Sequence, residues 1–546
     1  MFYLPAILLS VFITVSLIPL MMRLADRFQW MDLPNPRKVH TRPVPRIGGC
    51  AMALGAVVPL ILWAKPDNFV KAYLAGAGIL VLFGLVDDMK GIGYKAKFAV
   101  QLVAASMAVF FGGVRIESLG TLLLSEPQIP DWFSLPLSLV AIVGVTNAIN
   151  LADGLDGLAG GISFLGFCCI AYLAYLAEDH TALLLSLSMA GAIFGFLRFN
   201  THPATLFMGD TGSQLLGFSA VVLALKITQG HTPFSPILPL IILGFPVLDT
   251  LTVMVERVRE GRSPFSPDKN HFHHRLVRFG LYHSEAVFTI YVVQAVMIVS
   301  AVLFKYDSDW FLVVSYGVFS TLILTVFTLA DRRGFQVKRY PLIDYALKGR
   351  LRNIKDEHLI IRTSFPLANI IIPLVFLWSC LLPAAIPGYV SLMAGCFCIY
   401  ILMVWFFAKS HMEFCLRLVT FLTVPFVLYL IEGGRAAWIR PQWFALYQYS
   451  FGLIAFLGLL VAKYSRRGKG FRLTPMDFLI VFIAAVVPNL PDPSIQGHHL
   501  GLLSAKIIVM LFSYELLIKE LRGKFGALTA STLIGLALIC VRGIPL

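Results

Sequence analysis

The chain has 546 residues, of which 58% are hydrophobic and only 14% are charged. Ordinary soluble proteins hold about 25% charged residues, so this composition excludes a soluble enzyme, a disordered chain and a secreted disulfide scaffold. The 44 Lys and Arg outnumber the 30 Asp and Glu and leave a formal net charge of +14. In a membrane protein such an excess is typical of cytoplasmic loops, so no nucleic-acid partner is needed to explain it.

Apolar stretches of membrane-spanning length recur along the whole chain. A bilayer core of about 30 Å requires roughly 20 apolar residues per helix. This length predicts an all-α polytopic membrane protein with about eleven transmembrane helices before residue 331 and about seven in a C-terminal extension. The first eleven are expected at residues 2–22, 47–64, 70–86, 96–112, 132–151, 158–177, 181–197, 211–227, 235–256, 284–304 and 310–330.

A polar segment separates the two groups of spans. Residues 331–363 interleave many basic side chains with apolar ones, as in amphipathic segments at a membrane surface. We therefore predict three parts, which are a membrane-embedded domain at 1–330, a basic cytoplasmic linker at 331–363 and a second multi-span domain at 364–546.

Alternation of the spans places the basic loops together on one face of the membrane. The positive-inside rule makes that face cytoplasmic and puts the N-terminus outside. The polar clusters of the first 330 residues fall on the same face, and segments that converge on one membrane surface can build one site. The loops on this face are residues 23–46, 87–95, 152–157, 198–210, 257–283 and 331–362.

Two adjacent carboxylates, Asp87 and Asp88, end the third expected span. Such a pair at a membrane face is unfavourable unless a cation or a proton compensates it. A pair of charges that only marks the end of a helix explains them equally well. The other clusters on this face decide between the two interpretations.

The second cluster places Asn147, Asn150, Asp153 and Asp156 at steps of three residues. A helical continuation would align them along one side, and the glycines among them also permit a turn. Amide and carboxylate oxygens are the ligands that Mg²⁺ takes, usually together with phosphate and water. A capped helix start explains one such Asp but not four polar groups in phase.

In the third cluster, Asp210 lies between glycines at the start of a span. A helix N-terminus of this kind is a natural anion site, and Asp210 there would hold a metal ion rather than the phosphate itself. Capping of the helix is the simpler role for Asp210. Phe207, three residues earlier, is either a core residue or a platform on which a base stacks.

The fourth cluster gathers Asp268, His271, His273 and His274 in a basic loop. Imidazole and carboxylate groups can bind zinc, but the spacing shows no closed set of four ligands. Basic side chains around the histidines favour a diphosphate instead. A solvated basic loop is the plain alternative.

With these four clusters in this order on one face, the sequence resembles the polyprenyl-phosphate N-acetylhexosamine-1-phosphate transferases. This membrane family includes phospho-N-acetylmuramoyl-pentapeptide transferase and undecaprenyl-phosphate N-acetylglucosamine-1-phosphate transferase. The likeness covers about Asp32 to Leu276, and Phe272 interrupts the histidines as in the N-acetylglucosamine branch. The matching motifs are DLPNPRKVHTRPVPRIGG, DDMKG, NAINLADGLDG, FMGDTGS and DKNHFHHR.

The resemblance implies a role for each candidate residue. It assigns phosphate transfer to Asp87, Asp88 and Asp210. It places Mg²⁺, or alternatively Mn²⁺, near Asp210, Asn150 and Asp153. Positions associated with the uracil match Asp156 and Phe207. The remaining candidates for substrate binding are Lys38, His40, Arg46, Lys97, Asn147, His271, His273 and His274.

The expected activity follows from this resemblance. It is a Mg-dependent transfer of an N-acetylhexosamine-1-phosphate, of the GlcNAc type, from a UDP-sugar to undecaprenyl phosphate, with release of UMP. The reaction would take place on the cytoplasmic face of a bacterial plasma (inner) membrane and start a lipid-linked glycan of the cell envelope, such as lipopolysaccharide or exopolysaccharide. A homodimer is left open.

Two other functions remain open at this point. Many-span proteins with intramembrane carboxylates also transport solutes or ions, although transport sites lie near the midplane and these acids lie at span ends. The chain could also be bifunctional, with residues 364–546 as a polymer-assembly or docking module.

Overall fold

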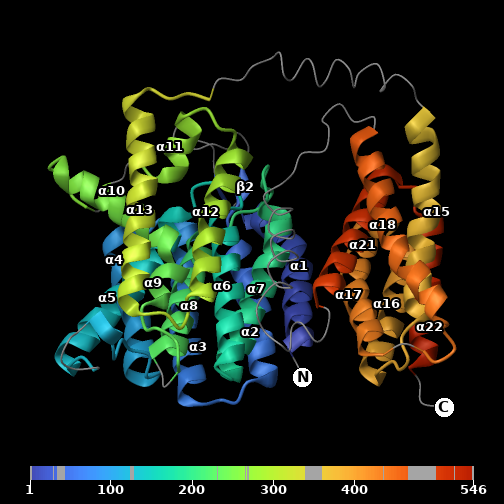
Figure 1. Ribbon diagram of the computed structural model, residues 1–546, viewed down its shortest axis with the longest axis horizontal. Helices are drawn as coiled ribbons and strands as arrows, with labels where there is room; N and C mark the ends of the chain where they lie inside the picture. The colour runs from blue at the N-terminus through green and yellow to red at the C-terminus, as the bar shows by residue number, and fades with distance from the viewer. Residues whose placement is uncertain are drawn as a thin grey trace. The chain divides into compact units, whose positions relative to one another are not determined.

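The computed structural model describes residues 3–28, 30–32, 43–122, 128–229, 232–264, 266, 270–337, 359–434, 436–464, 500–521 and 523–543. The chain forms two compact units, Met1–Lys338 and Arg339–Leu473 with Asp477–Leu546. Each unit is a bundle of helices (Figure 1). Twelve helices in the described part are long and apolar enough to cross a membrane, which confirms the predicted all-α polytopic class.

The first unit contains the helices that build the site. They are α1 (Tyr3–Phe28), α2 (Gly48–Trp63), α3 (Asn68–Lys90), α4 (Tyr94–Ser106), α5 (Asp131–Ala152), α6 (Leu158–Leu176), α7 (His180–Asn200), α8 (Gly209–Gln229), α9 (Leu238–Ile242), α10 (Gly244–Arg259), α11 (Phe272–Arg278), α12 (His283–Leu303) and α13 (Asp309–Arg332). A π-helical turn at Met107–Phe111 extends α4, and a short 3-10 turn lies at Gly120–Leu122.

Helix α8 is the core of the first unit. The share of its apolar window that is buried reaches 94%, against 11% for α13. Nearly every residue of α8 from Thr211 to Thr228 is buried, as expected of a helix packed inside a bundle. Glycines let its neighbours come close, because a Cβ on Gly84 of α3 would lie 2.6 Å from Thr211 Cα, and one on Gly217 would lie 2.6 Å from Thr146 Cα of α5.

The expected span at 235–256 differs from the structure. The chain there forms a short helix, α9, which ends at Ile242, and a second helix, α10, which begins at Gly244. Neither belongs to the twelve long apolar helices. Proline breaks helices, and α10 carries polar side chains, so it cannot face lipid on all sides. Figure 1 shows α10 running obliquely to the upright helices, near α11.

Two short strands tie the N-terminal loop to the site. Strand β1 (Met31–Asp32) pairs antiparallel with β2 (Val44–Pro45). Arg46 then pairs with Phe207, which precedes α8. Phe207 donates its backbone N–H to the Pro45 carbonyl at 2.8 Å. The loop that carries Arg46 is therefore fixed against the segment before α8.

The second unit holds six described helices, α15 (Leu359–Leu381), α16 (Gly388–Phe407), α17 (Met412–Gly433), α18 (Pro441–Tyr464), α21 (Leu500–Leu521) and α22 (Gly526–Arg542). Two ion pairs link α17 to α21, namely Lys506 to Glu432 at 2.7 Å and Arg417 to Glu515 at 2.8 Å. Most of the predicted linker, residues 338–358, and any seventh span at 465–499 lie outside the described residues.

The close approach of α3 to α8 gives a stability prediction. Gly84→Ala is expected to lower the unfolding temperature of the purified protein, because overpacking of this kind costs about 1–3 kcal/mol. Gly78 of the same helix is the matched control, because nothing lies within 4 Å of a Cβ there. Equal unfolding temperatures for Gly84→Ala and Gly78→Ala would contradict the contact.

Candidate active site

A cavity of about 350 Å³ lies where α3, α5, α8, α11 and α12 meet in the first unit. Side chains from all four polar clusters of the sequence reach it, together with Arg46 of the N-terminal loop. The polar residues that line it are Asp32, Arg46, Asp88, Asn150, Asp153, Asp156, Asn200, Asp210, Ser213, His274 and His283, and Phe207 joins them.

Asp88 holds the N-terminus of α8. Its carboxylate accepts hydrogen bonds from the Asp210 backbone N–H at 2.8 Å, the Thr211 N–H at 3.0 Å and the Thr211 hydroxyl at 2.8 Å. The first N–H groups of a helix have no partner within it, so an anion there is favourable. The cap predicted for Asp210 is thus supplied by Asp88 of another helix. Gly209, with a φ of +68°, leaves room for this carboxylate.

Lys97 joins two carboxylates of different helices. Its Nζ lies 2.9 Å from Asp87 Oδ2 and 3.1 Å from Asp210 Oδ2. Asn150 donates its amide to Asp210 Oδ1 at 2.6 Å and to the Ser213 hydroxyl at 2.7 Å. Candidates from three motifs, the acidic pair, Asn150 and Asp210, are therefore parts of one hydrogen-bonded cluster.

The predicted helical alignment of the second cluster is wrong beyond Asn150. Helix α5 ends at Ala152, so Asp153 and Asp156 lie in the loop before α6. Gly157 turns the chain there with a φ of +82°. Asn147 lies on α5, half-buried, and is not among the described residues that line the cavity.

Asp153 and Asp156 have opposite electrostatic settings. Burial, and then the charges of Asp210 and Asp88, raise the pKa of Asp153 to about 7, although Arg46 opposes this. Burial also acts to raise the pKa of Asp156. Hydrogen bonds from His202 Nδ1 at 2.7 Å and the Ala204 N–H at 3.1 Å outweigh it, and the pKa of Asp156 is lowered.

The three histidines of the fourth cluster have different surroundings. His271 Nδ1 donates to Asp249 Oδ2 at 2.9 Å, and Phe272 N–H donates to Asp249 Oδ1 at 2.8 Å. His273 is buried against Gly154, where a Cβ would lie 2.2 Å from its Nε2. Burial, and then the charges of neighbouring histidines, hold the pKa of His273 well below its ordinary value. Of the three, only His274 lines the cavity.

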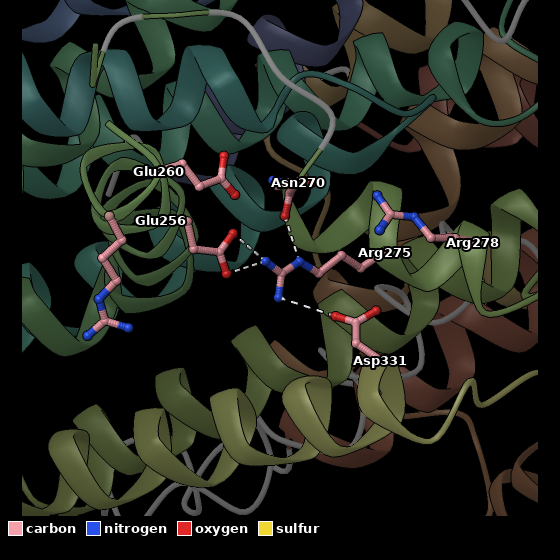
Figure 2. Close-up of a pocket in the computed structure, with 7 residues that line it drawn as sticks. Glu256, Glu260, Asn270, Arg275, Arg278 and Asp331 are labelled. Carbon is pink, nitrogen blue, oxygen red and sulfur yellow. Dashed lines mark hydrogen bonds and ion pairs between the residues drawn. The ribbon is translucent and has the colours of Figure 1, made fainter. Parts of the chain in front are cut away.

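A second anchor fixes α11, which carries these histidines. Figure 2 shows Arg275 reaching Glu256 of α10, Asn270 and Asp331 of α13. Its guanidinium pairs with both oxygens of Glu256, donates to the Asn270 carbonyl at 2.9 Å and lies 3.7 Å from an Asp331 oxygen. Arg275 is buried, and the carboxylates of Glu256 and Asp331 compensate its charge. Helix α11 is therefore locked onto α10 and α13.

Some candidates can be placed only in part. Arg46 lies 2.7 Å from Asp32 and lines the cavity. Lys38, His40 and Asp268 lie outside the described residues.

Several residues that shape the site were not among those predicted from the sequence. Asp249 and Glu256 could have been predicted from the sequence, because they lie seven residues apart and therefore share one face of α10. His202 and His283 carry no pattern of their own, since each comes to the cavity only through the packing of distant segments.

The fold and cavity define a multi-pass membrane protein with an acidic site at one end of its helical bundle, and comparison with known proteins identifies the family. Residues 70–228 match the family described as Glycosyl transferase family 4. The chain is 36% identical over 333 residues to the probable undecaprenyl-phosphate N-acetylglucosaminyl 1-phosphate transferase of Bacillus subtilis, which covers 60% of this chain and 93% of that protein.

Two further relatives agree. The chain is 30% identical over 342 residues to the undecaprenyl-phosphate alpha-N-acetylglucosaminyl 1-phosphate transferase of Escherichia coli K12, covering 61% of this chain and 92% of that protein. It is 32% identical over 304 residues to the decaprenyl-phosphate N-acetylglucosaminephosphotransferase of Mycolicibacterium smegmatis, covering 49% and 74%. The chain belongs to the polyprenyl-phosphate N-acetylhexosamine-1-phosphate transferase family, as its motifs predict. It is therefore an enzyme, a glycosyl-1-phosphate transferase.

The raised pKa of Asp153 predicts a pH-dependent stability. The folded state binds the Asp153 proton more tightly than the unfolded state, whose pKa is near 3.8, so stability falls as pH rises from about 4 to about 7. Asp153→Asn removes the charge and is expected to unfold at a higher temperature than the parent above pH 7, with no difference below pH 4. Asp307→Asn, at an exposed carboxylate, is the control. A difference in unfolding temperature between Asp153→Asn and the parent that does not change with pH would contradict the raised pKa of Asp153.

Proposed function

We propose that the chain transfers N-acetylhexosamine-1-phosphate, of the GlcNAc type, from a UDP-sugar to undecaprenyl phosphate and releases UMP. The observation that carries the proposal is the cluster in which Asp88 caps α8, and Lys97 lies between Asp87 and Asp210. The names of the relatives support the polyprenyl acceptor and the N-acetylglucosamine phosphate.

A divalent cation fits the residues of the cavity. Asp88, Asp153 and Asp210 all line it, and their mutual repulsion contributes to the raised pKa of Asp153. Mg²⁺ is commonly held by one or two carboxylates, with phosphate oxygens and water completing its shell. We assign Mg²⁺ to Asp210 with Asn150 and Asp153 as neighbours. Bound there, the ion would offset the charge on the diphosphate.

The residues around the proposed Mg²⁺ site have different roles. Both oxygens of Asp88 are engaged by the start of α8, so this residue orients Asp210. Asp87 Oδ2 pairs with the Lys97 ammonium at 2.9 Å, and we assign the acceptance of a proton from the lipid phosphate to Asp87. Arg46 and Lys97 supply positive charge for the two anionic substrates. Phe207 and Asp156 line the same cavity and are assigned to the uracil.

The proposed reaction is a single displacement at phosphorus. An oxygen of the lipid phosphate attacks the sugar-proximal phosphorus, and the bond from that phosphorus to the oxygen bridging the two phosphates breaks. UMP leaves with that oxygen, and the product is a diphosphate-linked lipid sugar. The positive-inside rule supports a site on the cytoplasmic face of a bacterial plasma membrane, since Arg46 lines the cavity and Lys97 pairs with Asp210, which also lines it.

The proposed reaction predicts a loss of turnover in the acidic cluster. With undecaprenyl phosphate and UDP-N-acetylglucosamine, Asp210→Asn and Asp88→Asn are each expected to release UMP at least ~100-fold more slowly, because charge stabilisation and orientation are lost. Asp307→Asn is the control with an exposed carboxylate. EDTA should abolish UMP release, and Mg²⁺ should restore it. Near-normal turnover in either cluster variant would remove that residue from the mechanism.

Asp249 is predicted to act as a positioning residue, because it holds His271 and the Phe272 N–H at the start of α11, the helix whose His274 lines the cavity. Asp249→Asn is expected to lower kcat by roughly 10-fold to 100-fold, as loss of an orienting partner often does, with a smaller effect on KM. Glu260→Gln is the control, because the carboxylate of Glu260 at the end of α10 pairs with exposed Arg262. An unchanged kcat, or an equal loss in Glu260→Gln, would contradict this role.

A further inference from the structure

Asp156, His202 and His283 form a compact group at the edge of the cavity. One ligand atom from each residue lies within 4.8 Å of the other two. His202 Nδ1 is 2.7 Å and His283 Nε2 is 4.0 Å from the same oxygen, Asp156 Oδ2. The two imidazole rings are stacked with their centroids 4.2 Å apart. The proposed reaction gives neither histidine a role.

His283 is unsatisfied in this setting. Its side chain is only 11% exposed, and neither ring nitrogen has a hydrogen-bond partner among the described residues. Buried polar atoms in proteins nearly always have a partner, so an imidazole with two unpaired nitrogens indicates a bound ion or water. A plain Asp156 to His202 hydrogen bond satisfies two members of the group and leaves the third unexplained.

We propose that Asp156, His202 and His283 bind a transition-metal ion of the Zn²⁺ class, separate from the magnesium assigned to Asp210. Two imidazole nitrogens and one carboxylate oxygen are standard zinc ligands, whereas Mg²⁺ prefers oxygen. Tetrahedral zinc with bonds of about 2.0–2.2 Å separates its ligand atoms by roughly 3.3–3.6 Å. The observed 2.7 and 4.0 Å lie on either side of that range, so small side-chain rotations complete the site.

The ion would have a regulatory consequence. Bound there, the ion would replace the hydrogen bond between His202 and Asp156, and two of its ligands, Asp156 and His283, line the cavity. A zinc ion there would take up the carboxylate assigned to the uracil and inhibit the transferase. This inhibition rests on the proposed function, whereas the binding of the metal does not.

The test is metal binding to the full-length chain purified free of metals in detergent. Zn²⁺ is titrated against a chromophoric chelator, and Co²⁺ is used as a spectroscopic probe of imidazole coordination. We expect one site whose affinity falls at least ~10-fold in His202→Ala and in His283→Ala, since each removes one of three protein ligands. His180→Ala is the matched control, because His180 lies at the opposite end of α7 from the His202 loop.

His274→Ala separates this group from the histidine cluster of α11. Zinc affinity lost in His274→Ala and kept in His283→Ala would overturn the proposal, as would the absence of a micromolar site. His202 is 41% exposed in a loop, so His202→Ala keeps the test valid if His283→Ala fails to fold. Zinc that binds this group without slowing UMP release would overturn the inhibitory role alone. An inactive enzyme without zinc would instead count against the proposed function.

Discussion

The site depends on a helix N-terminus that is capped by a carboxylate from another helix. Asp88 of α3 takes the first amides of α8, and Gly84, one turn earlier, lets the two backbones come close enough for it to do so. Because the N-terminal end of a helix is electropositive, the cap lowers the cost of burying Asp88 at the edge of the membrane. It also fixes the backbone of Asp210, which then faces Lys97 and Asn150.

Charge balance explains how so many acids can share one cavity. Lys97 compensates the carboxylates of Asp87 and Asp210, and the N-terminus of α8 compensates that of Asp88. Asp153 has no partner charge of equal effect among the described residues, and burial together with the charges of Asp210 and Asp88 raises its pKa. The cation that we propose at Asp210 would offset part of this negative charge. Helix α10 runs obliquely to the upright helices and holds α11 through Asp249 and Glu256 (Figure 1). The polar residues of α10 thus hold α11 in place.

The sequence predicted the class and most of the candidate site because its signals are local. Apolar length, basic loops and short polar motifs indicated the helices and the residues that meet at the cavity. Contacts between distant segments could not be predicted from the sequence, because they depend on how the helices pack. The cap by Asp88 and the approach of His202 and His283 to Asp156 are contacts of this kind. The break before Gly244 was missed because apolar length outweighed the prolines around it. The C-terminal unit has internal ion pairs such as Lys506 to Glu432, and it lies outside residues 70–228, which match the family.

Position-specific labelling of the donor tests the central claim most directly. Purified enzyme is given undecaprenyl phosphate and UDP-N-acetylglucosamine that carries ³²P in either the sugar-proximal or the nucleoside-proximal phosphate. Attack at the sugar-proximal phosphorus puts the first label in the extractable lipid and the second in released UMP. Sugar-proximal label that leaves with the nucleotide as UDP would show transfer of the sugar alone, and it would contradict the account.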